Sequence, residues 1–109
     1  MTTSVTDNVQ QHRYEIRVDG QLAGFTEYRR HPTLIEFVHT EIEPQYESRG
    51  LASQLVRTEL EAAGAAGLEV LPFCPFVRGY IESHHKYLDL VPLGRRAEFG
   101  LPSEDRLSE

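Results

Sequence analysis

The chain has 109 residues and a formal net charge of −6, from 11 basic and 17 acidic side chains. This acidic balance argues against electrostatic binding of nucleic acid and against a polybasic membrane anchor, because both require a basic surface. The single cysteine, Cys74, excludes an intrachain disulfide and a cysteine-cluster zinc site.

Length and hydropathy predict one small domain. A chain of this size buries roughly two-thirds of the surface of its unfolded state, which is enough for one hydrophobic core. No apolar run approaches the roughly eighteen residues of a membrane-spanning helix, and the polar first residues lack the apolar segment of a secretory signal. We therefore expect a protein of the cytoplasm, which is a reducing compartment.

The first half of the chain predicts an antiparallel β-meander. Residues 1–11 are mostly polar and predict a flexible lead-in. Residues 14–18 alternate apolar and polar side chains, as a half-buried strand does, and a tight turn at Asp19-Gly20 leads into a second strand over 22–30. Gly24 marks a bulge or a close backbone approach in that strand. A third strand follows over 33–42, which is rich in β-branched and aromatic residues.

The second half predicts a helix, a short strand and a second helix. Leucine and valine recur on one face of residues 51–63, while Arg57, Glu59 and Glu61 are expected to point away from it. A strand is expected over 68–71 and a helix over 76–85, followed by a turn or a short strand over 87–91. The side chains expected to face inward from this second helix are Phe76, Val77, Tyr80 and Ile81.

This order of elements predicts an α+β fold, a mixed α/β layer with helices packed on a sheet. The folded unit is expected to span residues 12–93, and residues 94–109 are expected to form a C-terminal tail.

The segment between the third strand and the first helix has the features of a phosphate-binding site. Ser48, Gly50 and Ala52 are small residues at alternate positions, and Arg49 adds a cation. A helix N-terminus offers unpaired backbone N–H groups and a positive dipole end, and small residues let a phosphate approach them. An ordinary turn into a helix, with Ser48 as the N-cap, explains the same residues.

Residues 42–56 (IEPQYESRGLASQLV) resemble the acetyl-CoA-binding motif of GCN5-related N-acetyltransferases (GNAT). That family has a strand followed by Gln/Arg-x-x-Gly-x-Gly/Ala at a helix start. Gly50 and Ala52 match the last two fixed positions, whereas Glu47 stands where Gln or Arg is usual. Residues 68–91, with a Pro-x-Cys-Pro-Phe segment, resemble a short single-domain branch of the superfamily.

The resemblance covers about residues 12–92 and implies a compact GNAT-like fold. It also implies acetyl-CoA as co-substrate, an amine as acceptor and no metal. The residues that it places at the cofactor are Ile42, Ser48, Arg49, Gly50, Leu51, Ala52 and Ser53.

Four residues are candidates for the catalytic chemistry. His39 and Glu41 share one side of a regular strand, close to the point where the family separates two neighbouring strands, so either is a candidate base for the amine. A structural histidine at a strand end and a solvated glutamate are the alternatives.

Cys74 and Tyr80 lie beyond the other strand of that pair. A cysteine at a helix start favours the thiolate form, and a covalent acetyl-cysteine route follows from it. A small, buried packing residue is the alternative for Cys74. Tyr80 corresponds to the tyrosine with which the family protonates the CoA thiolate, or it is a core aromatic. His84 and His85 point in different directions on a helix, and no metal site is expected there.

The functional hypothesis is an acetyl-CoA-dependent N-acetyltransferase acting on an amine of a small molecule or protein. The alternative is a CoA- or acyl-CoA-binding module without efficient turnover, which Glu47 and the missing acceptor-site helices of longer GNATs favour. A third hypothesis is an interaction domain that binds no such ligand.

Overall fold

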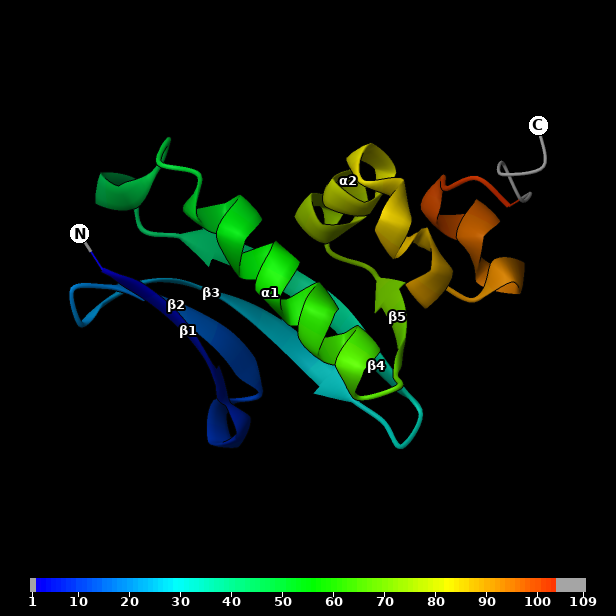
Figure 1. Cartoon of the computed structure of the whole chain (residues 1–109), viewed down its shortest axis with the longest axis horizontal. Helices are drawn as coiled ribbons and strands as arrows, with labels where there is room; N and C mark the ends of the chain where they lie inside the picture. The colour runs from blue at the N-terminus through cyan, green and yellow to red at the C-terminus, as the bar shows by residue number, and fades with distance from the viewer. Residues whose placement is uncertain (1, 104–109) are drawn as a thin grey trace.

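The computed structural model describes residues 2–103, which form a five-stranded sheet with helices packed against it (Figure 1). The strand order follows the chain, and every neighbouring pair is antiparallel except β4 and β5, which are parallel. The strands are β1 (Thr3–Asn8), β2 (Arg13–Val18), β3 (Gln21–Arg30), β4 (Leu34–Ile42) and β5 (Glu69–Pro72). This mixed sheet confirms the predicted α+β class.

Two α-helices and four short 3₁₀-helices complete the described fold. The long helix connects the two parallel strands and lies diagonally over the sheet, and the second helix follows β5 (Figure 1). Such a crossover is the usual way to join parallel strands. The helices are α1 (Leu51–Ala65), α2 (Pro75–Ser83), η1 (Val9–Gln11), η2 (Pro44–Tyr46), η3 (His85–Leu90) and η4 (Leu93–Phe99).

The N-terminal segment is a strand, so the predicted flexible lead-in is wrong over residues 3–8. β1 pairs antiparallel with β2 along its whole length. Its side chains also bond to the sheet, since the Tyr28 hydroxyl donates to Asp7 at 2.6 Å and the Asn8 amide donates to Glu15 at 3.0 Å. An edge strand needs few apolar side chains, which is why its polar sequence did not predict it.

The C-terminal segment also belongs to the fold, so the predicted tail is wrong over residues 94–101. Phe99 and Leu101 are buried in the core, and the Phe99 ring meets the Phe73 ring with a centroid separation of 5.1 Å. The Arg96 guanidinium donates to the Val91 carbonyl at 2.9 Å. The rest of the predicted tail, residues 104–109, lies outside the described residues.

Two hydrophobic clusters lie under α1, and the helix contributes to both. Leu51 and Leu55 pack against β2 in one cluster, and Val56 and Leu60 pack against β4, β5 and α2 in the other. Glu59 lies on the same face and is fully buried. The prediction that Glu59 points away from the core is therefore wrong, and we return to this residue below.

An irregularity in β4 decides which of its side chains face α1. Glu27 pairs with His39 and Tyr28 pairs with Phe37, so Val38 is an extra residue in β4. Phe37 and Thr40 therefore share a face despite their odd spacing. Beyond Phe37, β4 has no pairing with β5, whose last partner is Pro72. The two parallel strands therefore separate at this point.

Candidate functional site

The entry to α1 is a sharp, left-handed turn. Ser48 and Gly50 both have positive φ angles, of 68° and 74°, and Gly50 is the N-cap with no side-chain hydrogen bond to the helix. Ser48 is therefore not the N-cap, which the ordinary-turn alternative required. The first N–H groups of α1 have no acceptor within the helix, as at any helix start, and its first turn contains no acidic residue.

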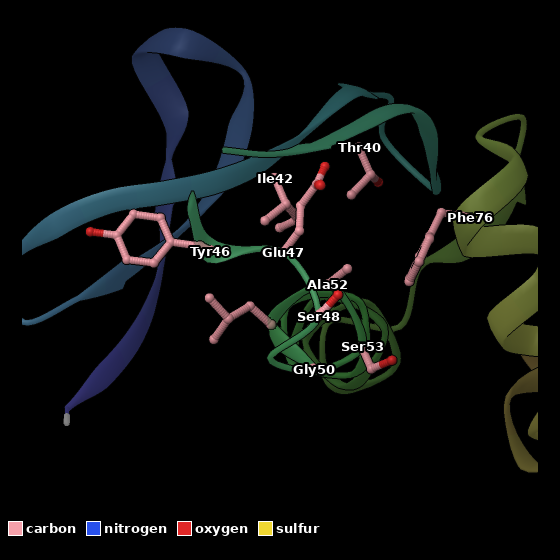
Figure 2. A pocket seen from close by; sticks show the side chains of 10 residues that line it. Thr40, Ile42, Tyr46, Glu47, Ser48, Gly50, Ala52, Ser53 and Phe76 are labelled. Atoms are coloured by element: carbon pink, nitrogen blue, oxygen red, sulfur yellow. The ribbon is translucent and has the colours of Figure 1, made fainter. Parts of the chain in front are cut away.

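A pocket of about 390 Å³ opens at this turn, between the start of α1 and the unpaired end of β4 (Figure 2). A Cβ placed on Gly50 would meet no atom within 4 Å, so the space above the turn is open to a ligand. Small side chains border it on the α1 side, and Phe76 borders it from α2. Its lining residues are Thr40, Ile42, Tyr46, Glu47, Ser48, Gly50, Leu51, Ala52, Ser53 and Phe76.

Six of the seven residues expected at the cofactor line this pocket, and Arg49 does not. The Arg49 guanidinium instead lies over the Tyr46 ring, 5.6 Å from its centroid. Phe76 was expected to face inward. Tyr46 lines the pocket while packing partly on the core, and Phe76 is 43% exposed at the pocket wall.

Glu47 is the one carboxylate among the residues that line the pocket. A carboxylate repels an anion, so Glu47 would oppose the binding of a phosphate in this pocket.

Cys74 lies immediately behind the pocket wall. Its side chain is buried and its thiol donates to the Thr40 hydroxyl at 3.2 Å. Its backbone N–H donates to the Phe37 carbonyl at 2.8 Å, and Cys74 is the N-cap of α2. Thr40 therefore separates the sulfur from the pocket, and the sequence contained no signal for this threonine.

His39 and Glu41 lie together on the face of β4 opposite Thr40 and Ile42. The His39 ring nitrogen and a Glu41 carboxylate oxygen are 3.0 Å apart, both side chains are about half exposed, and the ring also meets Phe25. They share a face, as period two predicted. The pocket opens on the other face of β4, so neither His39 nor Glu41 lines it.

Tyr80 on α2 is partly buried: it packs against the main core cluster and also lines two hollows beside the pocket. Its ring stacks on His84 with a centroid separation of 4.0 Å. The two hollows share residues with the pocket and extend it as a groove. One, of about 250 Å³, is also lined by Gly50 and Arg57, and the other, of about 360 Å³, by Ser53 and Phe76.

Within residues 2–103, no group of three or more histidine, cysteine, aspartate or glutamate side chains is arranged to hold a metal ion. No helix in the same range is both long and apolar enough to cross a membrane.

Comparison with known proteins decides the family. A family model described as GCN5-related N-acetyl-transferase matches residues 13–90. The chain belongs to this family. The match includes all of β2 to α2, and so contains the pocket and every candidate residue discussed above.

The solved structure of an N-acetyltransferase shares the fold. The ribosomal-protein-alanine N-acetyltransferase from Brucella melitensis biovar Abortus 2308 superposes with a TM-score of 0.53 at 18% identity, over 73% of this chain and 60% of that one. This GNAT chain thus spans 60% of the length of that protein, which is less than two thirds. A GNAT-family protein from Novosphingobium aromaticivorans DSM 12444 is 34% identical over 51% of this chain and 26% of its own, with a TM-score of 0.45. No curated protein matches the chain.

Proposed function

We propose that this GNAT chain is an acetyl-CoA-dependent N-acetyltransferase that acts on an amine of a small molecule or a protein. The observation that carries the proposal is the pocket at the left-handed entry to α1, beside the point where β4 and β5 separate. The proposed setting is the cytoplasm, where the buried thiol of Cys74 stays reduced.

The residues at the pocket fit the parts of acetyl-CoA. The first N–H groups of α1 would hold the pyrophosphate, where the helix dipole favours an anion. Thr40 and Ile42 border the place where β4 runs unpaired, which suits the extended part of the molecule. When bound, acetyl-CoA supplies an activated acetyl thioester.

The remaining chemistry requires a base for the amine and an acid for the departing thiolate. His39 and Glu41 form one hydrogen-bonded pair on the opposite face of β4, so an amine that enters through the strand gap would meet them. Tyr80 has its ring beside the groove and is the candidate acid. Cys74 is the candidate nucleophile for a covalent route, one hydroxyl away from the pocket.

A CoA-binding module without turnover is the second candidate function, and the position of Glu47 favours it. One experiment separates the two functions. Acetyl-CoA should raise the melting temperature of the protein. Addition of mixed primary amines should then release free CoA, and a reaction without amines is the blank. A melting shift without release indicates the binding module, and no shift overturns both functions.

The proposed base is tested separately. His39→Ala should leave acetyl-CoA affinity unchanged and lower turnover about a hundredfold or more, which is the usual contribution of a general base. His31→Ala is the matched control, because His31 pairs with Glu36 at 3.1 Å near the far end of β4. A proportional loss of affinity and turnover in His39→Ala would make His39 a structural residue.

A further inference from the structure

The most unusual side chain in the described core is Glu59 on α1. It is fully buried, and neither carboxylate oxygen makes a hydrogen bond of normal geometry with the described residues. Burial raises the pKa of Glu59 well above its ordinary value, and the nearby Thr26 hydroxyl offsets this only in part. A structural role in the core is served better by leucine, so an unpartnered carboxyl here calls for a chemical explanation.

A line of hydroxyl groups leads from Glu59 to Cys74. Thr26, fully buried on β3, lies next to Glu59 and opposite Thr40 in the strand register. The two threonine hydroxyl oxygens are 3.1 Å apart, and the Cys74 sulfur is 3.2 Å from the Thr40 oxygen. Each hydroxyl both donates and accepts a hydrogen bond. The line can therefore pass a proton in either direction without moving a heavy atom far.

No cation among the described residues offsets a charge on Glu59. The other elements at this position present Tyr14 from β2 and apolar residues from β4, β5 and α2. The charge on Glu59 helps to raise the pKa of Tyr14, after the larger effect of burial and that of Asp7. Because the surroundings of Glu59 are apolar, they favour a protonated Glu59 with the negative charge on another group.

The other end of the line lies at the start of a helix. Cys74 is the N-cap of α2, a nine-residue helix, so its sulfur lies near the positive end of that helix dipole. A helix start stabilises a thiolate, whereas an apolar core destabilises a carboxylate. Both effects favour the same transfer, from the thiol to the carboxylate.

We propose that Glu59 and Cys74 share one proton through Thr26 and Thr40, so that Glu59 is the internal proton acceptor that generates the Cys74 thiolate. The Cys74 S–H proton passes to the Thr40 oxygen as the Thr40 proton passes to the Thr26 oxygen and the Thr26 proton passes to the Glu59 carboxylate. Three bonds to hydrogen break and three form, and the negative charge moves from oxygen to sulfur. Only the use of this thiolate for acetyl transfer rests on the proposed function.

The single cysteine makes the proposal measurable without a ligand. Protein labelled with ¹³C at the cysteine Cβ should show one signal, whose chemical shift reports thiol or thiolate. We expect the wild-type signal to titrate in two steps, as coupled groups do. Glu59→Gln should give one step, because no second group then exchanges a proton with the thiol. Thr40→Val should give one step and a lower thiolate fraction at pH 7, because the thiolate loses its hydroxyl partner. Thr40→Ser, which keeps the hydroxyl, should retain the wild-type curve.

Matched controls separate the relay from a general disturbance of packing. Thr58→Val removes a threonine hydroxyl that bonds only to the α1 backbone at Gln54, and Glu15→Gln neutralises another buried glutamate. Both should leave the cysteine titration unchanged. The proposal is overturned if the control variants change the cysteine titration as much as Glu59→Gln and Thr40→Val do. It is also overturned if Glu59→Gln and Thr40→Val keep the wild-type titration curve.

A reciprocal measurement keeps the test decisive if a variant does not fold. With ¹³C at the glutamate Cδ, Cys74→Ser should convert the two-step titration of Glu59 to a single step, because serine does not ionise in this range. An unchanged Glu59 titration would overturn the shared proton. Since no acetyl-CoA is present in these experiments, their failure leaves the proposed acetyltransferase activity untouched.

Discussion

Gly50 is the residue on which the entry to α1 depends. Its φ of 74° is one that residues with a side chain adopt at a cost of about 1–2 kcal/mol, and its missing side chain leaves the pocket open. Ser48, with a φ of 68°, bears a similar strain two residues earlier. Gly50, a glycine position of the family motif, is thus a position of left-handed backbone here.

The binding site is tested by Gly50→Val with Gly67→Val as control. Gly67 has a φ of 72° and equally open surroundings, but lies at the far end of α1. Both variants should lose similar stability, because the backbone strain is the same. Only Gly50→Val should lose CoA affinity by more than tenfold, or about 1.4 kcal/mol, measured by calorimetry. Equal affinity of the two variants would place the pyrophosphate elsewhere.

The charge of Glu47 gives a second prediction for the pocket. Glu47→Gln should bind CoA more tightly, by about twofold or more at low salt, because it removes an anion beside the phosphates. The difference should shrink as salt rises, since the screening length falls to about 3 Å at 1 M. Glu43→Gln, an exposed change outside the pocket, should have a smaller effect. Calorimetry at two salt concentrations measures both, and an unchanged affinity of Glu47→Gln contradicts the assignment.

At the scale of elements, one extra residue in β4 changes which of its side chains face α1. Without Val38, regular alternation from Phe37 would turn His39 and Glu41 toward α1. With Val38 inserted, Thr40 and Ile42 face α1 and the pocket instead. The same strand therefore presents a hydroxyl to the Cys74 side and a His–Glu pair to the other face, on either side of the gap beside β5.

The edge strand β1 provides a prediction at the same scale. Deletion of residues 1–8 should lower the melting temperature by about 5 °C or more, since a loss of 1 kcal/mol shifts a domain of this size by roughly 4–8 °C. The deletion removes the β1–β2 ladder and the bonds to Tyr28 and Glu15. Thermal unfolding measures it, and an unchanged melting temperature would mean that these residues behave as the flexible lead-in.

At the scale of the whole molecule, two buried glutamates set opposite pH dependences of stability. Burial would raise the pKa of Glu15, but hydrogen bonds from Arg13 and Asn8 and the charges of Arg13 and Arg17 hold it below its ordinary value. Glu15 therefore stabilises the fold at pH values above the pKa that it has in the unfolded chain. This stabilisation is lost as the pH falls through the lower pKa that Glu15 has in the folded protein. Glu59 has a raised folded pKa, so it stabilises the fold in acid relative to neutral pH.

Glu59→Gln should remove the second of these dependences. Below about pH 4.3, the ordinary glutamate pKa, glutamate is protonated in both states and the variant should show no pH-dependent difference. Above it, the free energy of unfolding of the wild type should fall relative to the variant, by up to about 1.4 kcal/mol per pH unit. Urea unfolding between pH 4 and 8 measures the difference. Parallel curves for the two proteins would contradict the buried, protonated carboxyl.

Local pattern in the sequence determined the meander, the crossover helix, the short strand after it and the helix-start motif. Each depends on neighbours within a few residues: period two in β2, helical spacing in α1, and small residues at the entry to α1. The fold class and the residues around Gly50 were predictable for this reason, and a resemblance carried by the same residues indicated the family.

Tertiary structure alone decided which side chains meet across elements. β1 is polar because it needs only one strand partner, and Phe99 is buried because a distant segment returns to the core. Helical spacing placed Glu59 four residues beyond Leu55, on the buried stripe, yet its charge suggested exposure. The line from Glu59 through Thr26 and Thr40 to Cys74 joins α1, β3, β4 and the start of α2, and hydrogen bonds between residues so far apart in sequence leave no periodic signal.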